Sequence, residues 1–128
     1  MNSTVLDASA VMAVLNQEPG FEKLTPNLLS NACCSSVNMA EVLGKLVERG
    51  IQPDDAWDDV IAVVHQILPF NIEHAKTAGR LIAQTRASGL SLGDRSCLAL
   101  ALDLNAPVYT ADRSWKNLKL AVPIHIIR

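Results

Sequence analysis

Hydrophobic and polar positions along the chain predict short strands separated by helices. Apolar residues three and four positions apart mark the helices; Met39, Val42, Leu43 and Leu46 form one such stripe, which ends at Gly50. Short β-prone runs mark the strands. We expect strands over residues 4–6, 32–37, 68–70, 108–110 and 124–127, and helices over residues 8–16, 38–49, 53–66, 73–88 and 91–104.

This order of elements, without tight hairpins, predicts an α/β fold. We expect a three-layer sandwich in which helices flank a mainly parallel central sheet of four to five strands. The 128 residues fit a single domain, residues 1–128, and a hydrophobic content of 49% is enough for a packed core. In such sheets ligands bind at the carboxyl ends of the strands.

Charge, cysteine content and hydropathy limit the binding partners and the cellular compartment that we expect for this protein. The net charge of −2 is unlike that of a protein that binds nucleic acid by electrostatics alone, so a nucleic-acid site would have to be local. No apolar run approaches the ~20 residues of a membrane span, and no signal sequence is evident, so we expect a cytoplasmic protein without a membrane partner. Cys33, Cys34 and Cys97 form no metal-binding or redox motif and are expected to be buried and free.

Four acidic residues stand where such a fold would bring them together. Asp7 ends the first predicted strand and Asp112 follows the fourth, while Glu41 and Asp94 lie at the starts of two helices. Strand ends and these helix starts meet at one edge of a parallel sheet. Carboxylates are ligands that Mg²⁺ prefers, and Mg²⁺ or Mn²⁺ held there can activate water for phosphodiester hydrolysis.

Each of these acids also has a purely structural interpretation. Asp7 and Asp112 are suited to cap the turns that follow them. The four-residue patterns that start at Ser91 and at Asn38 resemble capping boxes, in which an acid in the first helical turn is ordinary. Position alone does not decide between capping and metal binding.

A second group of acids is interpreted as solvated. It surrounds Trp57 near the start of a predicted helix, where the helix dipole favours negative charge. Its members are Asp54, Asp55, Asp58 and Asp59.

Four segments around the first group of acids carry a family resemblance. They are residues 5–11 (VLDASAV), 36–42 (SVNMAEV), 90–101 (LSLGDRSCLALA) and 108–113 (VYTADR). In this order and spacing they resemble the PIN-domain nucleases, particularly the VapC-type toxins of bacterial toxin–antitoxin pairs.

The resemblance implies a metal-dependent endoribonuclease that cleaves RNA, forms a homodimer and is inhibited by a small antitoxin protein encoded nearby. Its cofactor would be Mg²⁺ or Mn²⁺, and its catalytic and metal-binding acids would be Asp7, Glu41, Asp94 and Asp112. Ser9, Asn38 and Thr110 would orient ligands, water or substrate. Arg95 and Arg113 each follow one of the acids directly and could contact RNA phosphates or antitoxin carboxylates.

Two alternatives remain open. A phosphatase of the haloacid-dehalogenase type also begins with a strand that ends in Asp, but that class needs a second Asp where this chain has Ser9. A non-catalytic binding module could keep the PIN fold and use it for protein contacts. The complete set of four acids disfavours that module, and a metal titration would distinguish it from a nuclease.

Overall fold

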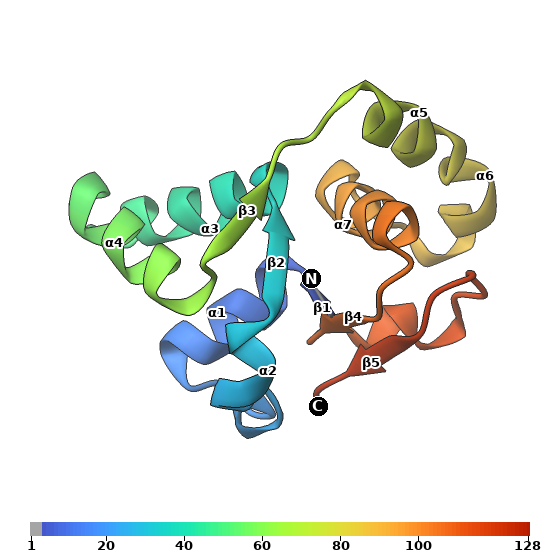
Figure 1. Ribbon diagram of the computed structural model, residues 1–128. Coiled ribbons are helices and arrows are strands. Elements are labelled where there is room, and N and C mark those ends of the chain that lie inside the picture. Colours follow the sequence, from blue (N-terminus) through green and yellow to red (C-terminus); the bar gives the residue numbers. More distant parts are fainter. Residues whose placement is uncertain (1–3) are drawn as a thin grey trace.

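Strands and helices alternate through residues 4–128, the part of the chain that the computed structural model describes (Figure 1). The elements are β1 (Thr4–Leu6), α1 (Ala8–Asn16), η1 (Phe21–Lys23), α2 (Pro26–Ser30), β2 (Ala32–Ser35), α3 (Ser36–Glu48), α4 (Pro53–Val63), β3 (Gln66–Leu68), α5 (Ile72–Arg80), α6 (Ile82–Thr85), η2 (Arg86–Ser88), α7 (Leu92–Leu104), β4 (Val108–Thr110), η3 (Arg113–Asn117) and β5 (Ile124–Ile126), where η marks a 3₁₀-helix.

The five strands form one sheet in the order β3-β2-β1-β4-β5, and every neighbouring pair is parallel. The predicted α/β sandwich with a parallel sheet is therefore confirmed. In the central strand β1, Val5 aligns with Cys33 of β2 and with Val108 of β4. Because all strands run the same way, their carboxyl ends share one edge of the sheet.

Helices cover both faces of the sheet. Helices α1, α3 and α4 lie on one side, and α5, α6 and α7 lie on the other (Figure 1). Successive strand residues point to opposite faces. Leu6 and Cys34 accordingly pack in the core beneath α1, α3 and α4, whereas Val5 and Cys33 pack against α7.

The three cysteines are buried and free, as expected. Burial raises the pKa of the Cys33 thiol to about 11 and raises the pKa values of the Cys34 and Cys97 thiols further. The thiol groups thus behave as small apolar core groups.

Helix α3 begins earlier than its apolar stripe predicts. The expected strand over residues 32–37 ends at Ser35, whose hydroxyl accepts a hydrogen bond from the Val37 backbone N–H at 3.2 Å. This cap starts the helix at Ser36, and Asn38 and Glu41 consequently both lie in its first two turns.

The third strand also differs from the prediction. The expected strand over residues 68–70 is wrong, because the strand is β3, Gln66–Leu68, and α4 ends at Val63 rather than near residue 66. Pairing with the neighbouring strand decides this, since Ile67 aligns with Cys34 of β2. Local hydrophobicity does not reveal that pairing.

The helix expected over residues 73–88 is divided into α5, α6 and η2. Gly79, a poor helix former, precedes the break, and the Thr85 hydroxyl donates a hydrogen bond to the Leu81 carbonyl at 2.8 Å. Such side-chain bonds to a preceding turn bend helices. The prediction also missed the short elements η1, α2 and η3.

Within residues 4–128, none of the helices has the length and hydropathy needed to span a membrane.

Candidate active site

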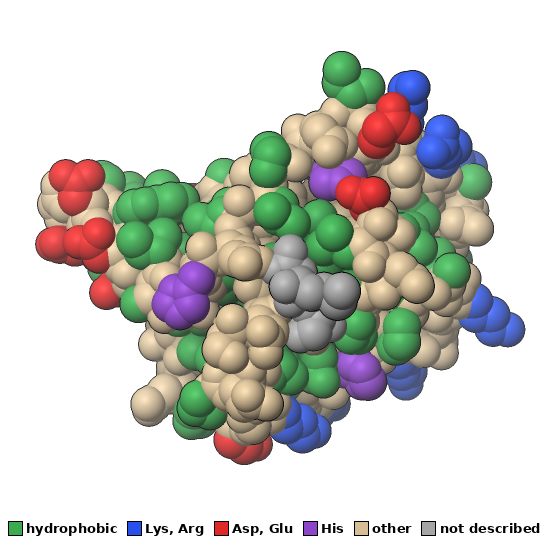
Figure 2. Space-filling view, in the orientation of Figure 1, with side chains coloured by type: hydrophobic (Ala, Val, Ile, Leu, Met, Phe, Trp, Pro, Cys, Tyr) green, Lys and Arg blue, Asp and Glu red, His purple; other side chains and the backbone are tan. Residues whose placement is uncertain are grey.

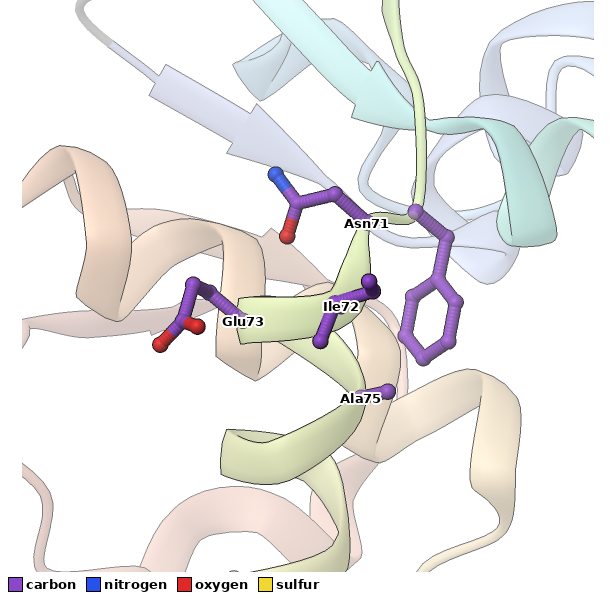
Figure 3. Close-up of a pocket in the computed structure, with 5 residues that line it drawn as sticks. Asn71, Ile72, Glu73 and Ala75 are labelled. Atoms are coloured by element: carbon purple, nitrogen blue, oxygen red, sulfur yellow. The ribbon is translucent and has the colours of Figure 1, made fainter.

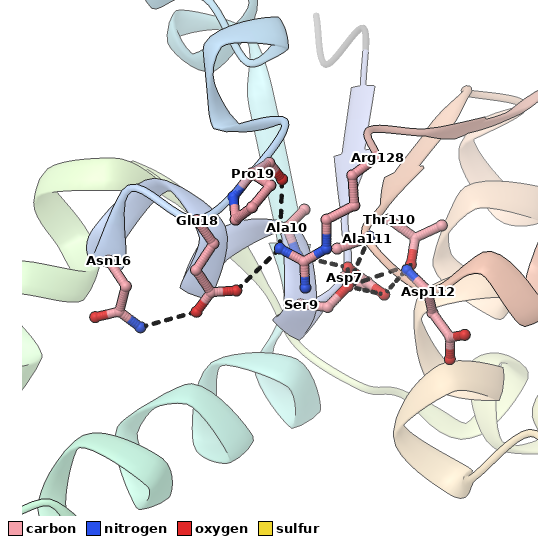
Figure 4. Close-up of polar contacts among 10 residues, drawn as sticks. All are labelled: Asp7, Ser9, Ala10, Asn16, Glu18, Pro19, Thr110, Ala111, Asp112 and Arg128. Atoms are coloured by element: carbon pink, nitrogen blue, oxygen red, sulfur yellow. Dashed lines mark hydrogen bonds and ion pairs between the residues drawn. The ribbon is translucent and has the colours of Figure 1, made fainter.

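Asp7 lies at the carboxyl end of the central strand and is 3% exposed. It caps α1, because its Oδ1 accepts a hydrogen bond from the Ala10 backbone N–H at 2.8 Å. The Ser9 hydroxyl donates to both carboxylate oxygens, at 2.7 and 2.9 Å, and the Thr110 hydroxyl donates to Oδ2 at 2.6 Å (Figure 4). Donors from two elements thus fix one carboxylate.

The position of Asp7 changes its acidity. Burial raises the pKa of the Asp7 carboxyl from 3.8 to about 6, and the negative charge of Asp94 adds to this rise. Hydrogen bonds from Thr110, Ala10 and Ser9 offset only part of the effect of burial on the pKa. A nearby cation would therefore stabilise the ionised form.

Ser9 and Thr110 also join the end of β4 to the start of α1. The Thr110 hydroxyl accepts a hydrogen bond from the Asp112 backbone N–H at 3.0 Å, and the Ser9 hydroxyl accepts one from the Ala111 N–H at 2.8 Å. Asp7 and Asp112, 105 positions apart in sequence, are therefore bridged by one hydroxyl group.

The Asp112 carboxylate is oriented differently from that of Asp7. Its Oδ1 accepts a hydrogen bond from the Ser114 backbone N–H at 2.9 Å and caps η3. In Figure 4 this carboxylate points away from Asp7.

Glu41 and Asp94 belong to the two helix starts on the same edge. Asn38 Nδ2 donates to Glu41 Oε1 and to the Gly93 carbonyl, both at 2.9 Å, and thereby joins α3 to α7. Asp94 forms a complete capping box with Ser91: Asp94 N–H donates to Ser91 Oγ at 3.1 Å, and Ser91 N–H donates to Asp94 Oδ2 at 3.0 Å.

Three of the four acids therefore cap helices and also lie at the shared edge of the sheet. Asp7, Asp94 and Asp112 each cap a helix or 3₁₀ turn, while the capping box expected from Asn38 to Glu41 is absent, because Ser35 caps α3 instead. Asn38 bonds the Glu41 carboxylate directly, and the charge of Asp94 acts on the pKa of Asp7.

The chemistry of this edge fits a hard divalent cation, although its side chains are not closed around one. Oxygen donors from four carboxylates are the type that Mg²⁺ and Mn²⁺ prefer. Among residues 4–128, however, no three His, Cys, Asp or Glu side chains form a group that could hold a metal ion.

The two candidate arginines differ in accessibility. Arg95 is half-buried, and its Nη1 donates to the Ala78 carbonyl at 2.8 Å, which ties α7 to α5. Arg113 is exposed, and its Nε donates to the Arg128 carbonyl at 3.0 Å.

An open hollow of about 560 Å³ lies away from these acids, at the start of α5 (Figure 3). Its lining is mainly apolar and comes from one continuous stretch of chain. The lining residues are Phe70, Asn71, Ile72, Glu73 and Ala75. None of the four candidate acids contributes to it, so its apolar character says nothing about phosphodiester chemistry.

The second acidic group lies on α4, where all four aspartates are exposed. Figure 2 shows acidic side chains at the tip that α4 forms, with Lys and Arg side chains on the opposite side of the view. This agrees with the interpretation of these acids as solvated.

Comparison with known proteins identifies the family. The model of the PIN domain matches residues 4–120. The chain belongs to the PIN domain family. No protein among curated sequences matches this PIN domain closely enough to count as a relative.

Several solved structures share the fold. A chain of the DNA-bound VapBC complex from Salmonella typhimurium is similar, with a TM-score of 0.79, 17% identity and 100% of both chains covered. VapBC2 from Rickettsia felis, bound to a promoter DNA fragment, has a TM-score of 0.75, 18% identity and 98% of both chains covered. Mycobacterium tuberculosis VapC20, a sarcin-ricin loop cleaving toxin, has a TM-score of 0.68 and 16% identity, with 87% of this chain and 91% of VapC20 covered. At these identities the likeness shows the fold.

One residue of this edge was missed by reasoning from the sequence. A Cβ atom added at Gly93 would overlap both carboxylate oxygens of Glu41. The only signal in the sequence is a glycine directly before Asp94 in the first turn of a helix, where glycine is not a favoured residue.

Proposed function

We propose that this PIN domain is a metal-dependent endoribonuclease and the toxin of a toxin–antitoxin pair. The observation that carries the proposal is the buried Asp7 carboxylate at the carboxyl edge of a parallel sheet, with its pKa raised by burial and by Asp94. A buried carboxylate with a neighbouring like charge is typical of a functional site.

The residues of this edge have distinct roles in the proposed reaction. Bound Mg²⁺ or Mn²⁺ would supply an activated water and neutralise charge on the scissile phosphate. Asp7, Glu41, Asp94 and Asp112 would hold the cation. Ser9 and Thr110 keep the Asp7 carboxylate in place through the hydrogen bonds that they donate to it. Asn38 does the same for Glu41.

The substrate and the partner are proposed by analogy with proteins of the same fold. VapC20 of M. tuberculosis is a sarcin-ricin loop cleaving toxin, and the VapBC complexes are toxin–antitoxin assemblies. By analogy, RNA is the proposed substrate and a small antitoxin the proposed partner. Arg113, which is exposed and directly follows Asp112 in the chain, is proposed to contact an RNA phosphate or an antitoxin carboxylate, and Arg95 is the second such candidate.

We also propose a homodimer, on the basis of the family resemblance. Ile72 and Leu92, 75% and 56% exposed, are the apolar residues at which to test it. Replacement of both with Asp should convert a dimer into a monomer in light scattering. A wild-type chain that is monomeric at high concentration would contradict the homodimer and leave the nuclease untouched.

Cleavage of an RNA pool tests the nuclease. The purified chain should cleave cellular RNA with Mn²⁺ or Mg²⁺ and stop when EDTA is added. Asp7→Asn should lower the cleavage rate by about 100-fold or more, because several kcal/mol of charge stabilisation are lost. Asp59→Asn on α4 is the matched control and should cleave like wild type. Activity that survives both EDTA and Asp7→Asn would refute the proposal.

Expression in cells tests the toxin. The chain should arrest growth when it is expressed alone, and co-expression with a small neighbouring reading frame should relieve the arrest and yield a complex. A chain that cleaves RNA but is harmless would contradict the toxin role only. A chain that binds neither metal ion would instead favour a non-catalytic binding module.

A further inference from the structure

Asn38 lies buried between two elements of the proposed site. Its side chain is 1% exposed, and its Nδ2 uses one hydrogen bond on Glu41 Oε1 and the other on the Gly93 carbonyl. Its Oδ1 is buried and has no hydrogen-bond partner among residues 4–128. A buried oxygen without a donor lowers the stability of the fold. The presence of an amide at this position is therefore best explained by the two groups that its nitrogen holds in place, the Glu41 carboxylate and the Gly93 carbonyl.

Gly93 provides the space for the same carboxylate. A Cβ atom at this position would overlap Glu41 Oε1 and Oε2, whereas a Cβ atom at Gly44 or Gly79 would meet nothing within 4 Å. Gly93 is helical, so the requirement concerns space and not backbone conformation. The Glu41 carboxylate therefore lies directly against the first turn of α7, one residue before Asp94.

We infer that Asn38 and Gly93 are positioning residues that hold the Glu41 carboxylate against the first turn of α7, in which Asp94 lies, in readiness for a divalent cation. This inference rests on the proposed nuclease function. Glu41 is otherwise exposed, and a free glutamate side chain would have to lose rotamer freedom each time a cation bound. Asn38 fixes the carboxylate from the side of α3, and the missing side chain at Gly93 lets it approach α7.

Substitution of Gly93 should affect stability and metal binding in opposite directions. The atoms that a Cβ at Gly93 would meet are the far end of a flexible side chain, so Gly93→Ala can be accommodated when Glu41 swings away. Alanine also favours the helix. Gly93→Ala should therefore keep or raise the melting temperature of the metal-free protein and still weaken metal binding.

Calorimetric titration of the full chain with Mn²⁺ tests this inference. Asn38→Ala and Gly93→Ala should each weaken Mn²⁺ binding by about 10-fold or more, the effect expected when a group that orients a metal ligand is lost. Gly79→Ala, on α5 with open space around it, is the matched control and should bind Mn²⁺ within about two-fold of wild type.

A double-mutant cycle with Glu41→Gln separates positioning from general damage. If Asn38 and Gly93 act through Glu41, neither substitution should weaken binding further, beyond about two-fold, once Glu41 is Gln. Equal losses in both backgrounds, or wild-type affinity in both single variants, would overturn the inference. If Asn38→Ala fails to fold, Gly93→Ala decides alone, because it leaves Asn38 in place. A wild-type chain that binds no Mn²⁺ would overturn the nuclease proposal as well.

Discussion

Two groups of four acidic residues in this protein have the same number of carboxylates but different surroundings. The first, the rim acids Asp7, Glu41, Asp94 and Asp112, comes from four separate parts of the chain that meet at the carboxyl edge of the sheet. The second, the α4 acids Asp54, Asp55, Asp58 and Asp59, comes from a single helix and is exposed.

The difference shows that surroundings rather than the number of carboxylates make a candidate site. Hydroxyl, amide and backbone donors fix all four of the rim acids, and Asp7 is buried with a raised pKa. Within residues 4–128 the α4 acids form no salt bridge, and water can solvate each of them. Near the start of a helix they gain from the dipole and need no cation.

The largest expected effect is a difference in RNA cleavage rate between two variants, each with one acid replaced by Asn, one from the rim and one from α4. Asp94→Asn should lower single-turnover RNA cleavage with Mn²⁺ by about 100-fold or more. Asn keeps the size of the side chain and can still accept the Ser91 hydrogen bond, so the metal-free stability should change by no more than about 1 kcal/mol. Asp58→Asn should leave cleavage unchanged. Full activity in Asp94→Asn would show that Asp94 acts only as a helix cap.

The pH dependence of stability should come from Asp7. Its folded pKa of about 6 lies above the ordinary value of 3.8, so the folded state binds this proton more tightly than the unfolded state does. Its contribution is fully present below about pH 4 and is lost as pH rises through 6, at a cost of about 3 kcal/mol. Urea unfolding of metal-free wild type and Asp7→Asn should diverge over this range. Parallel pH profiles of stability for the two proteins would show that the pKa of Asp7 is not raised in the folded state.

A divalent cation should stabilise the folded protein by binding to the rim acids, and the α4 acids should not contribute to this stabilisation. At about 100 times its Kd, Mn²⁺ should add about 2.7 kcal/mol to the free energy of unfolding. Thermal unfolding should show a rise in Tm for wild type and Asp58→Asn but not for Asp7→Asn. An equal rise in all three proteins would indicate a cation site elsewhere.

The smallest effect should separate the two roles of Asp94. Ser91→Ala removes the hydroxyl that accepts the Asp94 N–H bond, and the loss of such a cap costs about 1 kcal/mol. The carboxylate remains, so Mn²⁺ affinity should stay within about two-fold of wild type. Unfolding curves and a Mn²⁺ titration of this one variant measure both quantities. Loss of Mn²⁺ binding would show that the capping box itself orients the metal ligand.

Local patterns in the sequence predicted most of the fold. The strand before Asp7, the helix that follows it and the apolar helix after Asp94 lie where hydrophobic periodicity places them. The four acids were also visible, because strand ends and helix starts can be recognised locally. The misplaced third strand shows the limit: β3 is defined by hydrogen bonds to β2, which lies about 30 residues away.

By itself, the sequence determined which residues can do the chemistry: carboxylates, hydroxyls and an amide at the ends of predicted elements. Only the tertiary structure decided how these groups act on one another. Burial at the end of the central strand raises the pKa of Asp7, the Thr110 hydroxyl donates a hydrogen bond to it from 103 positions away, and Gly93 makes room for Glu41 from another helix. Such effects depend on distances between segments remote in the chain, and no local pattern of hydrophobic and polar residues encodes those distances.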